Sequence, residues 1–178
     1  MAKAKKKAKT AVKAGAKKAR APVPAKKHQS MKVVKVPAAV DQTDNKEIYR
    51  RFCADVLNGN NIERATQFLD PVVVSHSPLP EQQPGSDGFI ASLTAMRAAF
   101  PDLNAVATHL VAEGEFVAAR LQVSATHSGD FFGIRATGRR IQYEEQVFVR
   151  FAGGRIVEHW AVADGLSILQ QLDGQTPH

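Results

Sequence analysis

The sequence predicts an α+β domain in which one curved, mostly antiparallel sheet wraps around N-terminal helices. Two observations support this prediction. Most apolar residues between residues 44 and 100 follow helical spacing, apart from a short strand near residues 72–75, and those after residue 103 follow strand spacing. Residues 1–40 hold thirteen Lys and Arg and no acid, whereas residues 41–178 hold eleven Lys and Arg and all seventeen acids. We therefore expect a basic arm over residues 1–40 and a folded, acidic domain over residues 41–178.

The arm is rich in Lys and Ala and is interrupted by Gly15, Pro22, Pro24 and Pro37, which predicts disorder. Its composition resembles the tails of linker histones, whose lysines neutralise phosphates without reading bases, so weak nonspecific contact with nucleic acid is one interpretation. The other interpretations are a solvated tail, or translation that starts at Met31 in place of Met1.

The spacing of apolar residues and the residue types at helix ends predict four helices. Asp44 and Glu47 have the spacing of a capping box, and the apolar positions after them continue in helical register until Asn58-Gly59. Similar patterns predict further helices over residues 62–68, 86–100 and 166–172.

The strands are predicted from alternating apolar residues between Gly-containing turns. They cover residues 72–75, 105–112, 116–127, 140–151 and 155–163. Since most of these strands follow one another through short turns, most pairs in the sheet should be antiparallel.

Composition also excludes several classes of protein. No apolar run reaches the ~18 to 20 residues of a membrane-spanning helix, and no signal-peptide pattern opens the chain, so we expect a cytoplasmic protein with no membrane partner. A single cysteine, Cys53, excludes an internal disulfide framework. No metal-ligand spacing, phosphate loop or dinucleotide fingerprint is present, and we expect neither a metal nor a cofactor.

Two carboxylates interrupt apolar faces of the last two strands. Alternation places Glu158 and Trp160 on one face of residues 155–163, with Asp164 on the same face if the strand continues. On residues 140–151 it places Tyr143 and Glu145 on the apolar face. We expect Tyr143, Glu145, Glu158 and Trp160 to line one cavity and bind substrate there.

Each of these residues also has a structural interpretation. Asp164 is either a general base or the N-cap of the last helix. Glu145 either pairs with an arginine, such as Arg120 or Arg150, or hydrogen-bonds a ligand, because an unpaired buried carboxylate is costly. Glu158 could instead form a salt bridge, and Trp160 could belong to the core or to a dimer interface.

Three histidines lie at or near strand ends. His76 and His127 are candidate neutral hydrogen-bond donors at the mouth of a pocket, and the alternative is that they anchor loops. His159 is expected on the face opposite Trp160. The three come from separate segments and show no metal-ligand spacing.

Several segments, in consistent order over about residues 44–173, resemble the SnoaL-like polyketide cyclases, also called ester cyclases. The segments that carry the resemblance are Asn45–Asn58, Ser75–Pro78, Pro84-Gly85, Arg97–Leu103, Thr126–Gly133, Thr137–Arg139 and Glu158–Leu172. Ala136 departs from the pattern, since relatives often have Pro there, and the basic arm has no counterpart.

The resemblance implies the cone-shaped α+β barrel of nuclear-transport-factor-2-like proteins and a homodimer formed through the sheet. It also implies a cofactor-free intramolecular aldol condensation on a polyketide ester, with a pocket Asp as general acid/base. By motif position, the resemblance assigns that role to Asp164. The histidine at the strand end of the family motif corresponds to His127, and the histidine of the first strand corresponds to His76.

The leading hypothesis is therefore an enzyme that removes a proton α to a carbonyl from a small apolar substrate. Asp164 would be the base, and His127, His76 or Tyr143 would hydrogen-bond the enolate oxygen. Two alternatives are a non-catalytic, dimeric small-molecule-binding module and a nucleic-acid-associated protein that acts through its arm.

Overall fold

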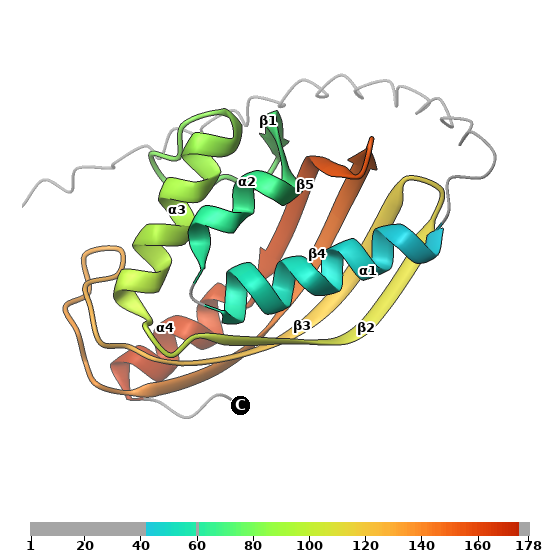
Figure 1. Ribbon diagram of the computed structural model, residues 1–178. Helices are drawn as coiled ribbons and strands as arrows, with labels where there is room; N and C mark the ends of the chain where they lie inside the picture. The colour runs from blue at the N-terminus through green and yellow to red at the C-terminus, as the bar shows by residue number, and fades with distance from the viewer. Residues whose placement is uncertain (1–41, 60, 175–178) are drawn as a thin grey trace, which may run out of the picture. The chain divides into compact units, whose positions relative to one another are not determined.

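The order of elements along the chain confirms the predicted α+β class. The structure is a computed structural model that describes residues 42–59 and 61–174 (Figure 1). The predictions about the arm of residues 1–40 lie outside these residues. Within them, helices come first, one strand and a long helix follow, and four strands and a last helix end the domain.

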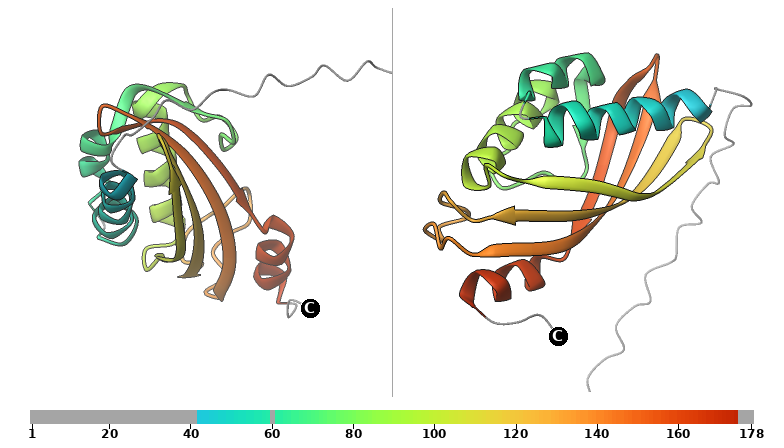
Figure 2. Two further views of the ribbon diagram at one scale, coloured as in Figure 1. Left: turned by 90° about the vertical axis from the view of Figure 1, so that its right-hand side faces the viewer. Right: turned by 60° about the horizontal axis from the view of Figure 1, so that its bottom comes forward.

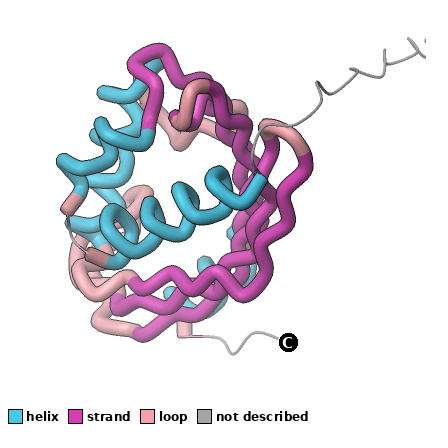
Figure 3. Tube along the Cα trace, turned by 45° about the vertical axis from the view of Figure 1, so that its right-hand side comes forward, coloured by secondary structure: helices cyan, strands magenta, loops and turns pink. Residues whose placement is uncertain are grey.

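One five-stranded sheet forms the frame of the domain. Its strands are β1 (Leu69–Ser75), β2 (Asn104–Glu113), β3 (Phe116–Thr126), β4 (Arg140–Ala152) and β5 (Arg155–Ala163). Their order across the sheet is β1-β5-β4-β3-β2, with β1 parallel to β5 and every other pair antiparallel. The sheet is open and curved, and the first helices lie within its curve (Figure 3).

The N-terminal helices cover the inner face of the sheet. They are α1 (Gln42–Phe52), η1 (Cys53–Asn58), η2 (Ile62–Arg64), α2 (Ala65–Phe68) and α3 (Gly85–Ala99). The last helix, α4 (Gly165–Asp173), packs against β4 and lies apart from α1 and α3 (Figure 2). No helix in the described part of the chain is long and apolar enough to cross a membrane.

The first predicted helix is continuous but changes its winding. Residues Cys53–Asn58 form a π-helix, η1, directly after α1. At its last residue, the Asn58 side-chain amide donates to Ala105 O at 3.0 Å and its carbonyl oxygen accepts from Ala105 N at 2.7 Å. These two bonds have the reciprocal pattern of paired strands, and they link the end of the helix to the start of β2. π-Helical turns are rare and often border functional sites.

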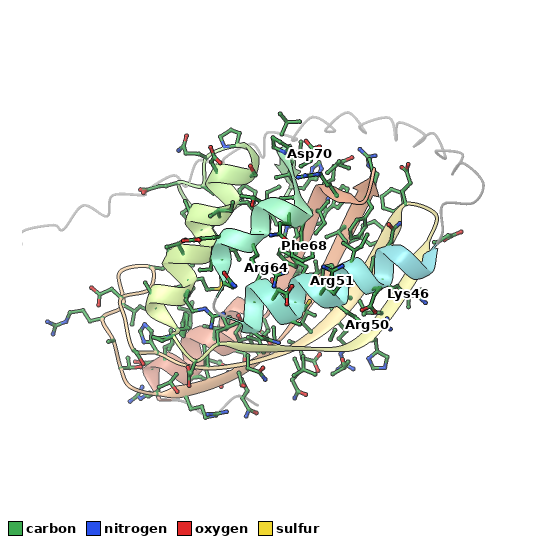
Figure 4. The ribbon with its side chains drawn as sticks, viewed as in Figure 1. Lys46, Arg50, Arg51, Arg64, Phe68 and Asp70 are labelled. Atoms are coloured by element: carbon green, nitrogen blue, oxygen red, sulfur yellow. The ribbon has the colours of Figure 1, made fainter. Side chains whose placement is uncertain are left out.

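A cation–π contact joins the first two α-helices. The Arg51 guanidinium of α1 lies 5.9 Å from the centroid of the Phe68 ring in α2 (Figure 4). The ring itself is buried and meets Phe52 edge to face, with centroids 5.8 Å apart. At an exposed site such a cation–π contact contributes about 0.5 to 1 kcal/mol.

The core lies between the helices and the inner face of the sheet. Alternation is clearest on β3, where the buried residues are Val117, Ala119, Leu121, Val123 and Ala125. Tyr143, Glu145, Val147 and Val149 of β4 follow the same alternation, because their register partners on β3 are these inward residues. The predicted inner face of β4 is therefore confirmed.

The predicted inner face of β5 is wrong beyond Ile156. Phe151 of β4 pairs with Ile156, but the preceding residue, Arg150, pairs with Glu158, so Val157 is an extra residue that forms a β-bulge. The bulge reverses the alternation. Ile156 still points into the core, but Glu158 and Trp160 point to the outer face of the sheet.

Candidate functional site

A pocket lies between the helices and the inner face of the sheet. It has a volume of about 200 Å³ and is bordered by α1, η1, α3, the loop after β1 and strands β2 to β5. Most of its lining side chains are apolar, among them Phe52, Leu93, Met96, Val147 and Ala161. A lining of this kind, with few polar groups, is typical of small-molecule sites.

Glu145 is the carboxylate of this pocket. The residues beside it on the neighbouring strands, Leu121 on β3 and Ala163 on β5, are apolar. Burial raises the pKa of Glu145 above its ordinary value. Within the described residues its carboxylate has no hydrogen bond or ion pair.

Glu145 was expected either to pair with an arginine, such as Arg120 or Arg150, or to hydrogen-bond a ligand, and pairing with these two arginines is wrong. Both arginines lie on the outer face of the sheet. Arg120 pairs with Glu144, and the Nε atom of Arg150 donates to Glu158 at 2.6 Å. Glu145 therefore faces the pocket without an arginine partner among the described residues.

Two tyrosines and one cysteine accompany Glu145. Tyr143 lies two residues before Glu145 on the same face of β4, as predicted, and Tyr49 reaches the pocket from α1. Burial raises the pKa of both phenols, and the charge of Glu145 adds to the rise, so both stay protonated hydrogen-bond donors. Burial also raises the pKa of Cys53 to about 12, which keeps it a thiol and excludes it as a nucleophile at neutral pH.

His159 faces the pocket, which the sequence analysis missed because the bulge at Val157 could not be read from alternation. Its ring meets Phe89 of α3 edge to face, with centroids 4.9 Å apart. The Nδ1 atom is buried with no hydrogen-bond partner. Burial, with a smaller effect from His76, lowers the pKa of His159 to about 4, so the imidazole is neutral at pH 7.

His127 lies outside this pocket, in the interior next to the loop between β3 and β4. Its side chain is fully buried, and its Nδ1 atom lies 3.1 Å from Thr137 Oγ1 and accepts from Thr137 N at 3.3 Å. Its ring lies against Phe100, with centroids 5.3 Å apart. These contacts match the loop-anchor interpretation of His127.

His76, Glu158 and Trp160 form a polar and aromatic cluster on the outer face. The Nε2 atom of His76 lies 2.7 Å from Glu158, which also accepts from Arg150. Hydrogen bonds from His76 and Arg150 lower the pKa of Glu158. The rings of His76 and Trp160 stack with centroids 4.3 Å apart. The prediction that Glu158 and Trp160 line a cavity with Tyr143 and Glu145 is therefore wrong.

Asp164 follows β5 and is exposed. Its carboxylate accepts from Ser167 N at 3.0 Å and so caps α4, as its structural interpretation predicted. It borders a shallow surface groove with Gln142, Glu144 and Val162, and it does not line the apolar pocket. In the part of the chain that the structure describes, no three His, Cys, Asp or Glu residues are grouped to hold a metal ion.

Helices within the curve of a mixed five-stranded sheet define an α+β domain of the nuclear-transport-factor-2-like class. The sequence pattern of the SnoaL-like polyketide cyclases matches residues 47–172. The chain belongs to this family, which confirms the resemblance found in the sequence.

Relatives support the assignment. Aklanonic acid methyl ester cyclase DnrD of Streptomyces peucetius is 29% identical over 112 residues, which cover 62% of this chain and 75% of the relative. A SnoaL-like polyketide cyclase of Agrobacterium tumefaciens is 31% identical, with a TM-score of 0.62 over 72% of this chain and 97% of its own. AclR of Streptomyces galilaeus, a candidate hydroxylase, is 28% identical, with a TM-score of 0.67 over 75% of this chain and 98% of its own.

Proposed function

We propose that this protein is a cofactor-independent ester cyclase that joins two carbonyl-bearing parts of one apolar substrate by aldol condensation. The observation that carries the proposal is Glu145, a carboxylate without a protein partner in an apolar pocket. A carboxylate held in this way is a stronger base than one in water, because desolvation disfavours its charged form. Membership of the polyketide cyclase family and the similarity to DnrD agree with this chemistry.

In the proposed reaction Glu145 takes a proton from a carbon α to a carbonyl group. The enolate oxygen accepts a hydrogen bond from the phenol of Tyr143, whose Cα lies about 7 Å from that of Glu145 along the strand. The nucleophilic carbon then attacks a second carbonyl carbon of the same molecule. Glu145 returns its proton to the new alkoxide, so protons balance and the carboxylate is regenerated.

The resemblance assigns the general base to Asp164, and the geometry favours Glu145. Asp164 is exposed and occupied with capping α4, whereas Glu145 borders the pocket. The same comparison favours Tyr143 over His127 and His76 as hydrogen-bond donor to the enolate, since of these three only Tyr143 lines the pocket.

Deuterium exchange tests this assignment without knowledge of the natural substrate. The probe is 4-acetylbiphenyl in D₂O, an elongated aryl ketone whose methyl protons are lost only if a base removes them. The wild-type protein should accelerate their exchange, followed by ¹H NMR, and Glu145→Gln should lower the enzymatic rate by about 10²-fold or more. Asp164→Asn is the matched control, because the amide still caps the helix, and it should retain the rate.

The proposal also predicts the direction in which the exchange rate changes with pH. Only ionised Glu145 accepts a proton, so the exchange rate should rise with pH through a pKa above that of an ordinary glutamate. If Asp164→Asn loses exchange while Glu145→Gln keeps it, the base is Asp164 and our assignment is wrong. If the wild type causes no exchange although it binds the ketone, the non-catalytic binding module is the better description.

A further inference from the structure

The pocket has two polar regions with an apolar stretch between them. One is formed by Glu145, Tyr143 and Tyr49. The other lies where β5 meets β1 and includes His159 and Ser75, which are partners in the strand register. Between them the sheet contributes Val147 and Ala161, which pair with each other across β4 and β5.

The strand register gives the separation of the two regions. Glu145 pairs with Ala163, four residues after His159 on β5. At 3.3 Å per residue the Cα atoms of His159 and Ala163 are about 13 Å apart. A small molecule held at Glu145 does not reach His159, whereas an elongated one does.

His159 has an unused hydrogen-bonding group. Its Nδ1 atom is sealed from solvent and has no partner, and neither ring nitrogen has a hydrogen bond within the described residues. The open nitrogen is therefore Nε2. Because a buried N–H without an acceptor is more costly than a buried lone pair without a donor, the proton belongs on Nε2. His159 thus presents a neutral N–H donor to the pocket.

We propose that His159 binds the far end of the substrate by donating from Nε2 to a carbonyl or hydroxyl oxygen. The ligand class is an elongated, uncharged and mainly apolar molecule with a carbon acid at one end and a hydrogen-bond acceptor about 10 Å away. This inference rests on the proposed function for the position of the carbon acid. The observations behind it are the inward side chain, the unpartnered ring and the apolar stretch between His159 and Glu145.

Three other polar side chains of the pocket, those of Ser77, Ser92 and Gln82, already form hydrogen bonds within the protein. Ser77 Oγ already accepts from Ala161 N at 3.2 Å, and Ser92 Oγ donates to Gly88 O at 3.1 Å. The Gln82 side-chain oxygen accepts from Leu79 N at 3.1 Å. The Ser77 and Gln82 bonds involve the loop after β1, and the Ser92 bond lies within α3, whereas neither ring nitrogen of His159 has a hydrogen bond within the described residues.

A matched pair of ketones tests the inference. The first is 4-acetyl-4′-hydroxybiphenyl, which has a carbon acid at one end and a hydroxyl group at the other. The second is 4-acetylbiphenyl, which lacks the hydroxyl group. By calorimetric titration the wild-type protein should bind the hydroxyl compound about threefold to tenfold more tightly, as one net hydrogen bond provides.

The variants assign this preference to one side chain. His159→Phe keeps an aromatic ring against Phe89 and should bind both ketones equally. His159→Gln restores an N–H donor and should recover part of the preference. His109→Phe, on the exposed outer face, is the matched control and should behave as the wild type. Melting temperatures measured in parallel show that each variant is folded.

The outcomes separate this inference from the proposed function. Equal binding of the two ketones by the wild type, or a preference that persists in His159→Phe, would overturn the role of His159. Glu145→Gln should lose deuterium exchange and keep the hydroxyl preference. If it keeps both, the assignment of the base fails while the ligand class stands.

Discussion

At the scale of single residues, the pocket holds a carboxyl group and an imidazole whose charged forms are disfavoured by burial. Glu145 has a raised pKa and His159 has one lowered to about 4. Neither has a protein partner for its charge within the described residues. Such groups destabilise a fold, so their position in a pocket is more readily explained by a ligand than by packing.

The lowered pKa of His159 predicts how stability depends on pH. Below pH 6.5 this histidine is protonated in the unfolded chain, whereas in the folded protein it stays neutral down to about pH 4. The free energy of unfolding therefore falls as the pH decreases through this window. Between pH 7 and pH 4.5 the wild type should lose roughly 2 to 3 kcal/mol more than His159→Phe. Urea unfolding at both pH values measures the difference.

The control for this prediction is His159→Gln, which also removes the titrating imidazole. Its loss of stability between the two pH values should equal that of His159→Phe. A wild-type curve parallel to that of His159→Phe would show that His159 is not held neutral by burial.

At the scale of elements, periodicity predicted every helix and strand of the described domain but gave the wrong inner face for β5 beyond Ile156. The faces of β3 and β4 follow strict alternation, so the inward positions of Tyr143 and Glu145 were predictable. On β5 the bulge at Val157 turns Glu158 and Trp160 outward and His159 inward. A bulge depends on pairing with the neighbouring strand, and β5 alone carries no sign of it.

The link between η1 and β2 gives the element-scale prediction. Asn58→Ala removes both bonds to Ala105 and leaves the backbone groups of a buried residue without these partners. We expect unfolding free energy to fall by about 2 kcal/mol, since each unsatisfied buried group costs about 1 to 3 kcal/mol. Urea titration measures this fall.

Asn61→Ala is the matched control, because Asn61 is exposed and makes no side-chain cap. Its unfolding free energy should stay within about 0.5 kcal/mol of the wild type. A similar value for Asn58→Ala would mean that water replaces the two bonds and that the end of η1 is not fastened by them.

At the scale of the whole domain, the outer face of the sheet is unusually apolar. The exposed fractions are 66% for Val111, 42% for Phe148 and 70% for Val162. Phe148 stacks on Phe116 with centroids 5.1 Å apart and lies 5.6 Å from Trp160. Alternation places Phe148 on the face of β4 opposite Glu145, but it wrongly placed Trp160 on the inner face of β5. Whether a face meets solvent or a second chain does not follow from the alternation of one chain.

The last prediction is that two copies of the chain pair through the outer face of the sheet. Exposed apolar patches of this kind mark interaction surfaces, and the resemblance to the SnoaL-like cyclases implies a homodimer through the sheet. Light scattering after gel filtration should give twice the chain mass of 19.3 kDa for the wild type. Phe148→Glu places a charge at the centre of the patch and should shift the protein to monomers.

Val72→Glu is the control for this prediction, because Val72 is 79% exposed but lies on β1, at the edge of the sheet. It should remain dimeric, since its charge stays in solvent beside the interface. A monomeric wild type, or a dimer unaffected by Phe148→Glu, would contradict pairing through this face. Because Glu145 and His159 point to the opposite face, Phe148→Glu should keep the hydroxyl preference of the pocket even as a monomer.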